Sequence, residues 1–343
     1  MRLGFDATSL TPEGKGLARF QREVLTAAAE LGEPEELVIF VPEEPEEGAL
    51  PAVAGWQYVH VETRPMLRWE QLGLPRAAKA LRLDVVLTLS ERAALWGPPR
   101  VVYVFEHPRL RVQRNREVGV GARQRLVDGV TLGLFFLAQR RAAAVLASSE
   151  STRRDLGRGT VVYPGVSREF SPGDARPRGY FLHIASHDPR DNTETVLAAH
   201  ERCGVEASLV VGGSRRVEGP GVEFVGYRTG EALADLYRGA IAYVDPSLYE
   251  GFGLQALESL ACGTPVICSN VTSLPEVVGD AGMLLDPLDV DGFAAAMRRL
   301  AEDEALRDDL SRKAIAQAGR FSWERTVREC VAACSEAVKP RMR

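Results

Sequence analysis

This sequence of 343 residues has no long apolar run, few cysteines and only a small net charge. No apolar run approaches the roughly 20 residues that a membrane-spanning helix needs. Five cysteines without regular spacing favour reduced thiols in a cytosolic protein over a disulfide framework. The net charge of −5 argues against nucleic acid as the main partner. The sequence opens on a strand-like run at residues 2–6 without the pattern of a signal peptide, so we expect a cytoplasmic protein.

Residue types that can hold a metal ion are present, but their settings favour other roles. Cys330 and Cys334 are one helical turn apart and no second Cys/His pair accompanies them, so we predict that they pack in a helix interface. The segment Asp289–Val290–Asp291 has the form of an Asp-x-Asp metal motif. Because Gly292 and an apolar run follow it, we predict that Asp291 is a helix N-cap. We therefore expect no metal site.

Strand-like runs alternate with helical patterns along the chain, which indicates a parallel α/β protein. A chain of 343 residues rarely folds around one core, and we expect two α/β domains. The predicted domains are residues 1–166 and 179–325, and the Pro-, Gly- and charge-rich segment 167–178 is the predicted linker. The predicted strands are residues 3–5, 37–41, 58–61, 85–89, 101–104, 144–147, 161–163, 180–184, 207–211, 222–225, 241–244, 266–268 and 283–285.

The most informative segment is residues 246–258, with the sequence PSLYEGFGLQALE. It follows a strand-like run and contains a glycine turn, and a short helix is predicted to begin near Leu254 and to stop at Gly263. The first amides of a helix lack acceptors within it and its dipole is positive there, which favours a phosphate. Gly251 and Gly253 carry no Cβ, so a ligand can approach the backbone closely.

Two carboxylates in this segment indicate a second kind of ligand group. A phosphate would be repelled by Glu250 and Glu258, whereas vicinal hydroxyl groups can donate two hydrogen bonds to an ionised carboxylate. Amides that suit a phosphate, beside carboxylates that suit a diol, are what a nucleotide sugar requires. We therefore predict a nucleotide-sugar site on this segment.

Glu-x7-Glu around Gly-Phe-Gly resembles the C-terminal signature of the family 4 glycosyltransferases, which have the GT-B fold. The resemblance covers residues 179–325 and continues through the motifs ACGTPVI, LPEVVGDAG and FSW. It implies two Rossmann-like doubly wound domains that face a central cleft, and a final helix, residues 326–343, that crosses back to the N-terminal domain. Residues 1–166 would then form the acceptor side.

The resemblance further implies a retaining, metal-independent hexosyltransferase that moves a hexose from a nucleotide-diphosphate sugar, of UDP or GDP type, to a hydroxyl acceptor. The acceptor is expected to be a glycan, a lipid-linked molecule or a small molecule, and no cofactor is expected. In this interpretation Glu250 acts in catalysis and Glu258 binds the ribose. The other expected donor contacts are Val225, Gly251, Phe252, Gly253, Leu254 and, from an N-terminal glycine loop, Gly16.

The chain departs from the family pattern where two cations are expected to hold the diphosphate. Ser186 stands in the place of an arginine and Asp191 in the place of a lysine, so only Arg190, one position earlier, keeps a cation. Fixed cations stabilise the charge that a leaving diphosphate develops. Either Arg190 takes over this role with His187, or with the arginines at 215–216, or donor binding is weakened. A purely structural role for Arg190 also stays open.

A second departure lies in the N-terminal half, where Phe105–Glu106 stands in place of the family's His-Asp pair at a strand end. His107 could supply the imidazole from a shifted position and is our catalytic candidate, with a solvated loop histidine as the alternative. The arginine-rich segment Arg109–Arg125 and an apolar stretch at residues 130–137 follow. Two interpretations stay open: an acceptor surface or peripheral contact with the inner face of a membrane, and an ordinary charged lobe.

Two other functions stay open at this stage. A protein with a vestigial donor site, acting as a scaffold or regulatory partner, is favoured by Ser186 and Asp191 and opposed by the intact Glu-x7-Glu. A GT-B phosphorylase should need more phosphate-binding cations than the sequence offers. Binding of nucleotide sugars discriminates between these alternatives and the transferase.

Overall fold

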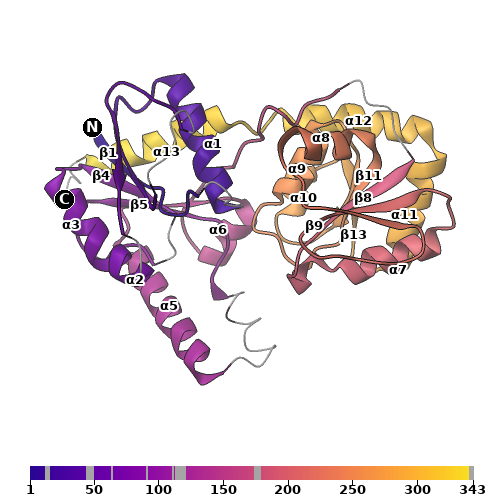
Figure 1. Ribbon diagram of the computed structural model, residues 1–343, viewed down its shortest axis with the longest axis horizontal. Coiled ribbons are helices and arrows are strands. Elements are labelled where there is room, and N and C mark those ends of the chain that lie inside the picture. Colours follow the sequence, from indigo (N-terminus) through magenta and orange to yellow (C-terminus); the bar gives the residue numbers. More distant parts are fainter. Residues whose placement is uncertain are drawn as a thin grey trace. The chain divides into compact units, whose positions relative to one another are not determined.

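The computed structural model describes residues 1–11, 16–43, 50–62, 65–89, 92–109, 112, 121–173 and 179–339. The chain divides into an N-terminal unit, residues 1–165 with 323–343, and a C-terminal unit, residues 166–322. Each unit has one parallel β-sheet with helices on both faces (Figure 1). The prediction of two doubly wound α/β domains is therefore confirmed.

In the N-terminal unit, the described residues form a seven-stranded sheet in the order β3-β2-β1-β4-β5-β6-β7. This is the doubly wound order with one added strand, and the chain reverses its direction across the sheet between β1 and β4. The strands are β1 (Arg2–Asp6), β2 (Glu36–Val41), β3 (Trp56–His60), β4 (Val85–Thr88), β5 (Arg100–Val104), β6 (Ala144–Ala147) and β7 (Thr160–Val161). The helices are α1 (Leu17–Leu31), α2 (Met66–Arg68), α3 (Leu74–Ala80), α5 (Ala122–Arg141), α6 (Glu150–Leu156) and α13 (Trp323–Val338), with a π-helical turn η1 (Trp69–Gly73).

In the C-terminal unit, the described residues form a six-stranded sheet in the order β10-β9-β8-β11-β12-β13, and the reversal lies between β8 and β11. The strands are β8 (Tyr180–Ala185), β9 (Ser208–Gly213), β10 (Val222–Gly226), β11 (Ala240–Asp245), β12 (Val266–Ser269) and β13 (Gly282–Leu285). The helices are α7 (Thr193–Cys203), α8 (Gly230–Gly239), α9 (Leu254–Ala261), α10 (Leu274–Val278), α11 (Val290–Glu302) and α12 (Glu304–Ala318), with a 3-10 turn η2 (Pro189–Asp191). Each predicted strand in either half overlaps an observed one.

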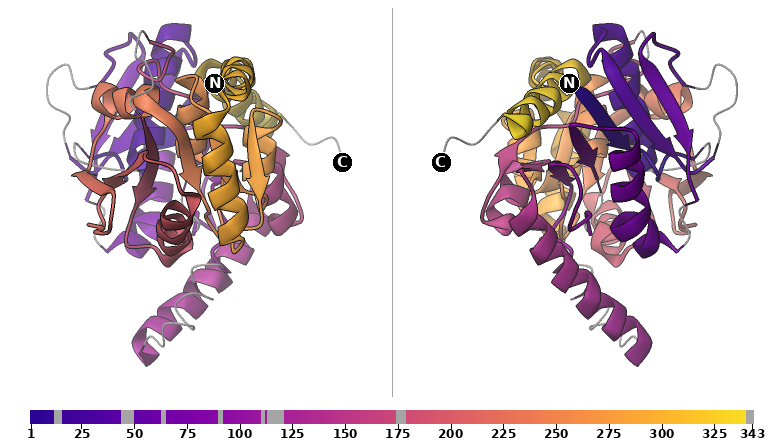
Figure 2. Two further views of the ribbon diagram at one scale, coloured as in Figure 1. Left: turned by 90° about the vertical axis from the view of Figure 1, so that its right-hand side faces the viewer. Right: turned by 90° about the vertical axis from the view of Figure 1, so that its left-hand side faces the viewer.

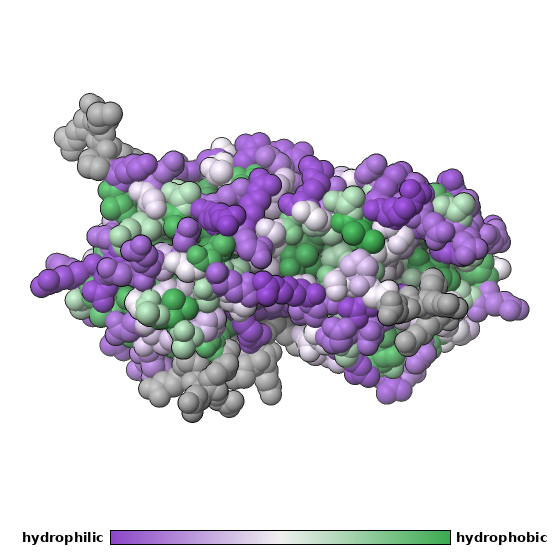
Figure 3. Space-filling model, turned by 90° about the horizontal axis from the view of Figure 1, so that it is seen from above, coloured by the Kyte–Doolittle hydropathy of each residue, from purple (hydrophilic) through white to green (hydrophobic). Residues whose placement is uncertain are grey.

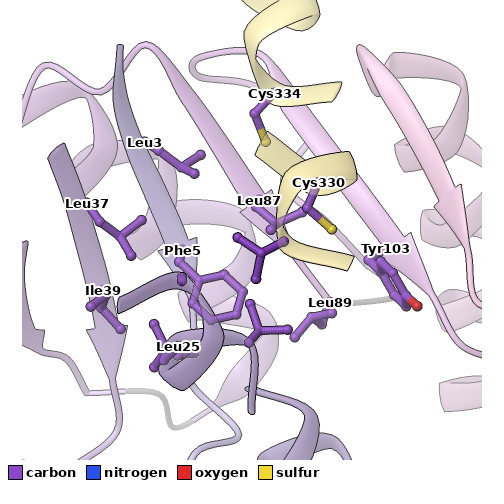
Figure 4. Packing of buried hydrophobic residues seen from close by; sticks show 14 of the residues in the cluster. Leu3, Phe5, Leu25, Leu37, Ile39, Leu87, Leu89, Tyr103, Cys330 and Cys334 are labelled. Atoms are coloured by element: carbon purple, nitrogen blue, oxygen red, sulfur yellow. The ribbon is translucent and has the colours of Figure 1, made fainter. Parts of the chain in front are cut away.

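Alternation of side chains along the strands divides the core of the N-terminal unit between the two faces of its sheet. Leu37 and Ile39 of β2 pack with α1 and α13, whereas Phe40 packs with η1 and α3. Figure 4 shows Cys330 and Cys334 of α13 among the core side chains of the first face. Both thiols are buried, which confirms the prediction that these cysteines pack in a helix interface.

The C-terminal sheet is also covered on both faces. Phe181 of β8 and Leu209 of β9 are buried together with Val196 of α7 and Phe293 of α11, which fixes these two helices side by side. Helices α8, α9, α10 and α12 pack with one another elsewhere in the unit.

On the face drawn in Figure 3, hydrophilic side chains predominate and the apolar patches between them are small.

The helix α13 packs with the N-terminal unit although it follows the C-terminal unit in sequence. Trp323, its first residue, meets Phe20 of α1 edge to face, with 5.2 Å between the ring centroids. The Thr326 hydroxyl donates to the Tyr163 carbonyl at 2.6 Å. The FSW motif therefore marks the point where the chain leaves the C-terminal unit.

The segment predicted as a linker lies only partly within the described residues. Residues 174–178 are outside them, and residues 167–173 belong to the C-terminal unit. There the Arg238 guanidinium donates to the carbonyls of Glu169 and Ser171, at 2.7 and 2.9 Å. These bonds order the described part of the segment on α8.

The helix α11 is capped by a different residue from the one predicted. Asp289 is the N-cap, because its Oδ1 accepts from the Gly292 amide at 2.9 Å. Asp291 lies in the first turn and pairs with Arg202 at 2.9 Å. The prediction of Asp291 as the N-cap is wrong because the cap bond requires a carboxylate two or three residues before the amide, and Asp289 has that spacing.

Candidate active site

The candidate site lies at the carboxyl edge of the C-terminal sheet, where the loops after β8 and β11 begin. These strands are neighbours, and the chain continues from them in opposite directions across the sheet. Ligands of open α/β sheets bind at such a reversal. The loop after β8 covers residues 186–192 and the loop after β11 covers residues 246–253. The sequence analysis singled out residues in both loops.

The backbone of Glu250 is fixed by the loop that follows β12. Its amide donates to Thr272 Oγ1 at 3.0 Å, and its carbonyl accepts from Ser273 Oγ at 2.8 Å. Thr272 has a φ of 54°, which is strained for a β-branched residue. Strain of this kind persists where surrounding contacts impose it, often at functional sites. At Thr272 the strained backbone accompanies the hydrogen bond that its hydroxyl accepts from the Glu250 amide.

The surroundings of the Glu250 carboxyl favour its protonated form. Glu250 retains some exposed surface, but protein groups enclose its carboxyl and this burial raises its pKa to about 8. The charges of Asp245 and Asp191 act in the same direction, while Arg190 and a hydrogen bond from Ser247 oppose the shift. Glu250 therefore carries a proton at neutral pH, and its carboxyl can donate to a ligand hydroxyl as well as accept from one.

A buried pair of titratable residues supports the same loops. Asp245 ends β11, and its Oδ1 accepts from the Ser247 amide at 3.2 Å and from the Ser247 hydroxyl at 2.5 Å. His183 of β8 places Nδ1 2.9 Å from the Val244 carbonyl and Nε2 3.0 Å from Thr193 Oγ1. A carbonyl only accepts, so Nδ1 carries the proton and Nε2 accepts from the threonine. Burial lowers the pKa of His183, which keeps its ring neutral.

Ser186 and Asp191, which replace the two expected cations, are bonded to each other. The Ser186 amide donates to Asp191 Oδ2 at 2.6 Å, and the Ser186 hydroxyl accepts from the Asp188 amide at 3.1 Å. These bonds close the turn after β8. Asp191 thus has a local structural role that a lysine cannot fill, because an ammonium group has no acceptor.

Arg190 lies in this turn, and Asp188 holds its guanidinium. Nε and Nη2 both donate to Asp188 Oδ2, at 3.2 and 3.0 Å, and the guanidinium carbon lies 6.0 Å from the centre of the Tyr249 ring. The positive charge of Arg190 also lowers the pKa of Glu250, so it acts on the site. Asp188 neutralises part of that charge.

The other cationic candidates are less well placed to hold a diphosphate. His187 is exposed. Arg215 pairs with Glu194, and Arg216 pairs with Glu218 at 2.9 Å. Arg190 is therefore the best placed of these cations, because its charge acts on Glu250.

Asn192 joins three loops at this edge of the sheet. Its Nδ2 donates to the carbonyls of Pro246 and Pro287, at 3.0 and 2.7 Å, and its Oδ1 accepts from the Thr195 hydroxyl at 3.0 Å. Its φ of 52° is left-handed, a conformation that asparagine tolerates better than most residues. Sequence analysis missed this residue because its partners are distant in the chain.

The helix α9 begins at Leu254, as the sequence predicts. Gly253 precedes it with a φ of 93°, and a Cβ there would lie 2.9 Å from Leu274 Cδ2, so the position requires glycine. The first bond of the helix runs from the Leu257 amide to the Gly253 carbonyl. The amides of the preceding turn, Leu254 among them, therefore have no acceptor within the helix and can receive an anion. The helix ends before Gly263, whose φ of 77° confirms its role at the C-terminus.

Glu258 lies one turn inside α9 and is only 3% exposed. The Tyr237 hydroxyl donates to its Oε2 at 3.2 Å, so a ribose diol would share this carboxylate with Tyr237. Phe252 is buried and meets Phe321 edge to face at 5.7 Å, so its side chain is structural. Val225 lies within β10, partly buried.

Two predicted site residues belong to the N-terminal unit. Gly16 is the N-cap of α1 with a φ of 51°, and no atom that the structure describes lies within 4 Å of where its Cβ would be. His107 follows β5, and its ring packs 4.8 Å from the ring of Phe135. Its Nδ1 accepts from the Arg109 amide at 3.0 Å, and burial lowers its pKa. His107 is thus a buried, neutral imidazole, and its interpretation as a solvated loop residue is wrong. Within the segment Arg109–Arg125, residues 110, 111 and 113–120 lie outside the described residues.

A buried carboxylate at the carboxyl edge of the N-terminal sheet escaped the sequence analysis. Asp6 ends β1 and accepts from the hydroxyls of Thr8 and Thr88, at 2.8 and 3.0 Å, and from Trp69 Nε1 at 3.4 Å. Burial raises its pKa. Because β1 and β4 flank the reversal of this sheet, Asp6 lies where ligands of such sheets bind. The one sequence feature that could have indicated Asp6 is a single carboxylate at the end of an apolar run, and the same holds for Asp245.

Neither a cluster of metal-binding side chains nor a membrane-spanning helix is present among the described residues. No group of three or more His, Cys, Asp or Glu side chains in them is arranged to hold a metal ion. Among the helices of the same ranges, none combines the length and apolar character needed to cross a membrane.

The sequence of the site region matches a known family. Residues 181–317 match the model described as Glycosyl transferases group 1. The chain is 40% identical over 164 residues to the O-antigen chain mannosyltransferase B of Escherichia coli, which covers 43% of each protein. It is 42% identical over 119 residues to the D-inositol 3-phosphate glycosyltransferase of Salinispora tropica, which covers 34% of this chain and 25% of that protein. The chain thus spans less than half the length of these curated relatives.

Solved structures of low sequence identity share the fold over nearly the whole chain. Sucrose-phosphate synthase (tll1590) from Thermosynechococcus elongatus has a TM-score of 0.76 at 20% identity, with 96% of this chain and 97% of that chain covered. Anabaena Alr3699/HepE in complex with UDP has a TM-score of 0.71 at 16% identity, with 98% and 100% covered. The chain therefore has the GT-B fold, and residues 181–317 of its C-terminal unit form a glycosyltransferase group 1 domain of the family 4 type.

Proposed function

We propose that this protein is a retaining, metal-independent glycosyltransferase that moves a hexose from a nucleotide-diphosphate sugar to a hydroxyl acceptor. The name of one relative, a mannosyltransferase, supports transfer of a hexose, and the name of another, D-inositol 3-phosphate glycosyltransferase, supports transfer of a glycosyl group. The donor is of UDP or GDP type, and complexes of a structural relative with UDP and with UDP-glucose favour the first of these. The acceptor class is a glycan, a lipid-linked molecule or a small molecule.

One observation carries this proposal: Glu250 is held by its backbone beside the open first turn of α9. The Thr272 and Ser273 hydroxyls fix its amide and carbonyl, and Gly253 starts the helix three residues later. Phosphate oxygens can take the free amides of α9, and sugar hydroxyls can then reach the Glu250 carboxyl. Glu258, on the same helix, is our candidate for the ribose diol.

In the proposed reaction, the bond between the anomeric carbon and the leaving phosphate oxygen breaks, and its electron pair stays on the diphosphate. The acceptor oxygen attacks from the same face, and its proton passes to the leaving phosphate oxygen. Glu250 stabilises the positive charge that develops on the sugar ring, and Arg190 and the α9 amides stabilise the diphosphate. Glu250 acts as the carboxylate: with a pKa of about 8, a minor fraction of it is ionised at neutral pH, so its proton passes to solvent before the sugar reacts.

A panel of UDP-, GDP-, ADP- and TDP-sugars in a thermal-shift assay tests donor binding directly. A sugar nucleotide at 100 times its Kd should stabilise the protein by about 2.7 kcal/mol, and one or more members of the panel should raise the melting temperature. The effective donor, incubated with candidate hydroxyl acceptors, should give a product whose anomeric configuration by NMR matches the donor. An inverted product would contradict the retaining mechanism.

A vestigial donor site is the second candidate, and one observation favours it. Asp191 is bonded to the Ser186 amide and Arg190 is paired with Asp188, so carboxylates engage both the position of one expected cation and the arginine that remains. A scaffold or regulatory protein needs no cations there. If no nucleotide sugar in the panel binds at millimolar concentration, this candidate replaces the transferase.

A further inference from the structure

Arg100, the first residue of β5, is a buried arginine whose charge no carboxylate among the described residues neutralises. It is 6% exposed, and its Nη1 donates to the Pro98 carbonyl at 3.2 Å. Burial lowers the pKa of Arg100, and the positive charge of Arg141 acts in the same direction. A buried cation that lacks an opposite charge lowers the stability of a folded protein. The surroundings of Arg100 are therefore suited to an anion.

Arg100 is on the face of the sheet that α5 covers, beside the C-terminal end of that helix. Because side chains alternate along a strand, Arg100 shares a face with Val102 and Val104, and these two residues pack with Ala138 of α5. The Ala143 amide, just beyond the helix, donates to the Arg100 carbonyl at 2.9 Å. Figure 2 shows one end of α5 against the sheet of its own unit, and these contacts identify it as the C-terminal end.

Two buried hydrogen-bond donors at this end of α5 have no acceptor among the described residues. They are Arg100 Nε and Gln139 Nε2. Gln139 lies in the last turn of α5 and is 5% exposed. Buried polar atoms of folded proteins are nearly always hydrogen-bonded, and each unmade bond costs free energy. A guanidinium and an amide that both lack an acceptor favour a ligand with several acceptor oxygens.

Two exposed arginines add positive charge at the same place. Arg158 Nη1 donates to the Gln139 carbonyl at 2.9 Å, and Arg141 Nη1 donates to the Leu95 carbonyl at 3.2 Å. Each bond uses one of the five N–H donors of a guanidinium. In the part of the chain that the structure describes, neither arginine pairs with a carboxylate. Because both side chains are exposed, a ligand from solution can reach them.

We propose that the start of β5 and the end of α5 form a binding site for the phosphate group of a small molecule. Phosphate oxygens accept from Arg100 Nε and Gln139 Nε2, and the guanidinium groups of Arg141 and Arg158 neutralise the ligand's charge. A phosphate suits three guanidinium groups better than a carboxylate does, because it carries up to two charges and more acceptor oxygens.

This phosphate site is separate from the edge of the sheet where we expect substrates. Arg100 begins β5 and Asp6 ends β1, and both strands run parallel to β4 between them. The two residues therefore lie at opposite edges of the N-terminal sheet, and Glu250 belongs to the other unit. The inference goes beyond the proposed transfer reaction and does not depend on it.

Titration calorimetry and thermal shift with the full chain test this inference, in a phosphate-free buffer at constant ionic strength. Inorganic phosphate or glycerol 3-phosphate should bind and raise the melting temperature, whereas acetate at the same concentration should not. The tighter of the two phosphates identifies a free or an esterified ligand, and either supports the site. Arg141→Gln and Arg158→Gln should each weaken phosphate binding at least about fivefold, because each removes a charge-assisted contact.

Two control variants separate this site from others that attract phosphate. Arg154→Gln should bind phosphate like the wild type, because Arg154 is also exposed and donates to a helix carbonyl, that of Glu150. Arg190→Ala alters the proposed donor site in the other unit and should leave the phosphate effect intact. Loss of the effect in Arg190→Ala alone would place the phosphate in the donor site and overturn the inference.

Arg100→Met distinguishes a phosphate site from arginines that only stabilise the end of α5. Methionine removes the buried charge, so without phosphate this variant should be at least as stable as the wild type, and phosphate should no longer raise its melting temperature. A phosphate effect that persists in Arg100→Met and in Arg141→Gln overturns the inference. So does wild-type protein that binds neither phosphate at millimolar concentration, or that binds acetate as tightly.

Discussion

The backbone of Glu250 is fixed by two hydrogen bonds, and the surroundings of its carboxyl disfavour ionisation. Glutamine preserves its shape but cannot provide the negative charge that we assign to the transition state. We expect Glu250→Gln to lower kcat at least about tenfold while nucleotide affinity stays similar, because the lost interaction forms only as the sugar becomes cationic. Steady-state kinetics and titration calorimetry check the two parts. Turnover near that of the wild type would remove Glu250 from the mechanism.

The raised pKa of Glu250 also predicts how stability depends on pH. Its pKa is about 8 in the folded protein, against 4.5 for an unperturbed glutamate. Between these values the folded chain keeps a proton that the unfolded chain releases, so this group's contribution is full below pH 4.5 and is lost as pH rises through 8. Denaturant unfolding at pH 5 and at pH 8.5 should show a larger loss of stability for the wild type than for Glu250→Gln, by a few kcal/mol at most. Equal losses would contradict the shift.

Arg190 should recognise phosphate rather than the nucleoside. We expect Arg190→Ala to weaken binding of a nucleoside diphosphate by about 1–3 kcal/mol and to leave nucleoside binding nearly unchanged, because a guanidinium bonds to phosphate oxygens through charge-assisted hydrogen bonds. Arg215→Ala is the matched control, since Arg215 is also paired with a carboxylate in this unit. Equal losses for diphosphate and nucleoside in the Arg190 variant would show that phosphate is recognised elsewhere.

At the scale of elements, Asn192 couples the loops after β8, β11 and β13. Asn192→Ala removes three hydrogen bonds and leaves an alanine in a left-handed conformation, so it should lower the free energy of unfolding by about 2–4 kcal/mol. Asn192→Gly loses the same bonds but tolerates the backbone, so it should be about 1 kcal/mol more stable than the alanine variant. Denaturant titrations measure both. A loss below about 0.5 kcal/mol for Asn192→Ala would show that the loops hold without this side chain.

Short sequence patterns predicted where the helices and strands lie. They could not predict the hydrogen bonds between those elements. The strands and α9 follow from apolar runs and glycine positions, which act over a few residues. The bond from the Glu250 amide to Thr272 spans 22 positions, and the bond from Asn192 to Pro287 spans 95. The bond between Ser186 and Asp191 was missed for another reason. The family pattern has cations at these two positions, so the comparison treats Ser186 and Asp191 only as replacements. In the structure the two residues are bonded to each other and close a turn.

At the scale of the whole molecule, both units share the doubly wound strand order. A local pattern of strands and helices does not choose among strand orders, so the resemblance to the GT-B fold supplied this part of the prediction. The two reversals carry buried carboxylates, Asp6 at the end of β1 and Asp245 at the end of β11. Neither was predicted, because a single acidic residue at a strand end is a weak signal without the sheet order.

The central claim is that the C-terminal unit binds a nucleotide diphosphate with Glu258 on the ribose. Titration calorimetry of the wild type, Glu258→Ala and the control Glu302→Ala, an exposed glutamate of α11, with UDP and GDP tests it most directly. We predict binding by the wild type and the control, and a loss of about 1–3 kcal/mol in Glu258→Ala, because the ribose hydroxyls lose their acceptor. Unchanged affinity in Glu258→Ala, or no binding of either nucleotide by the wild type at millimolar concentration, would contradict it.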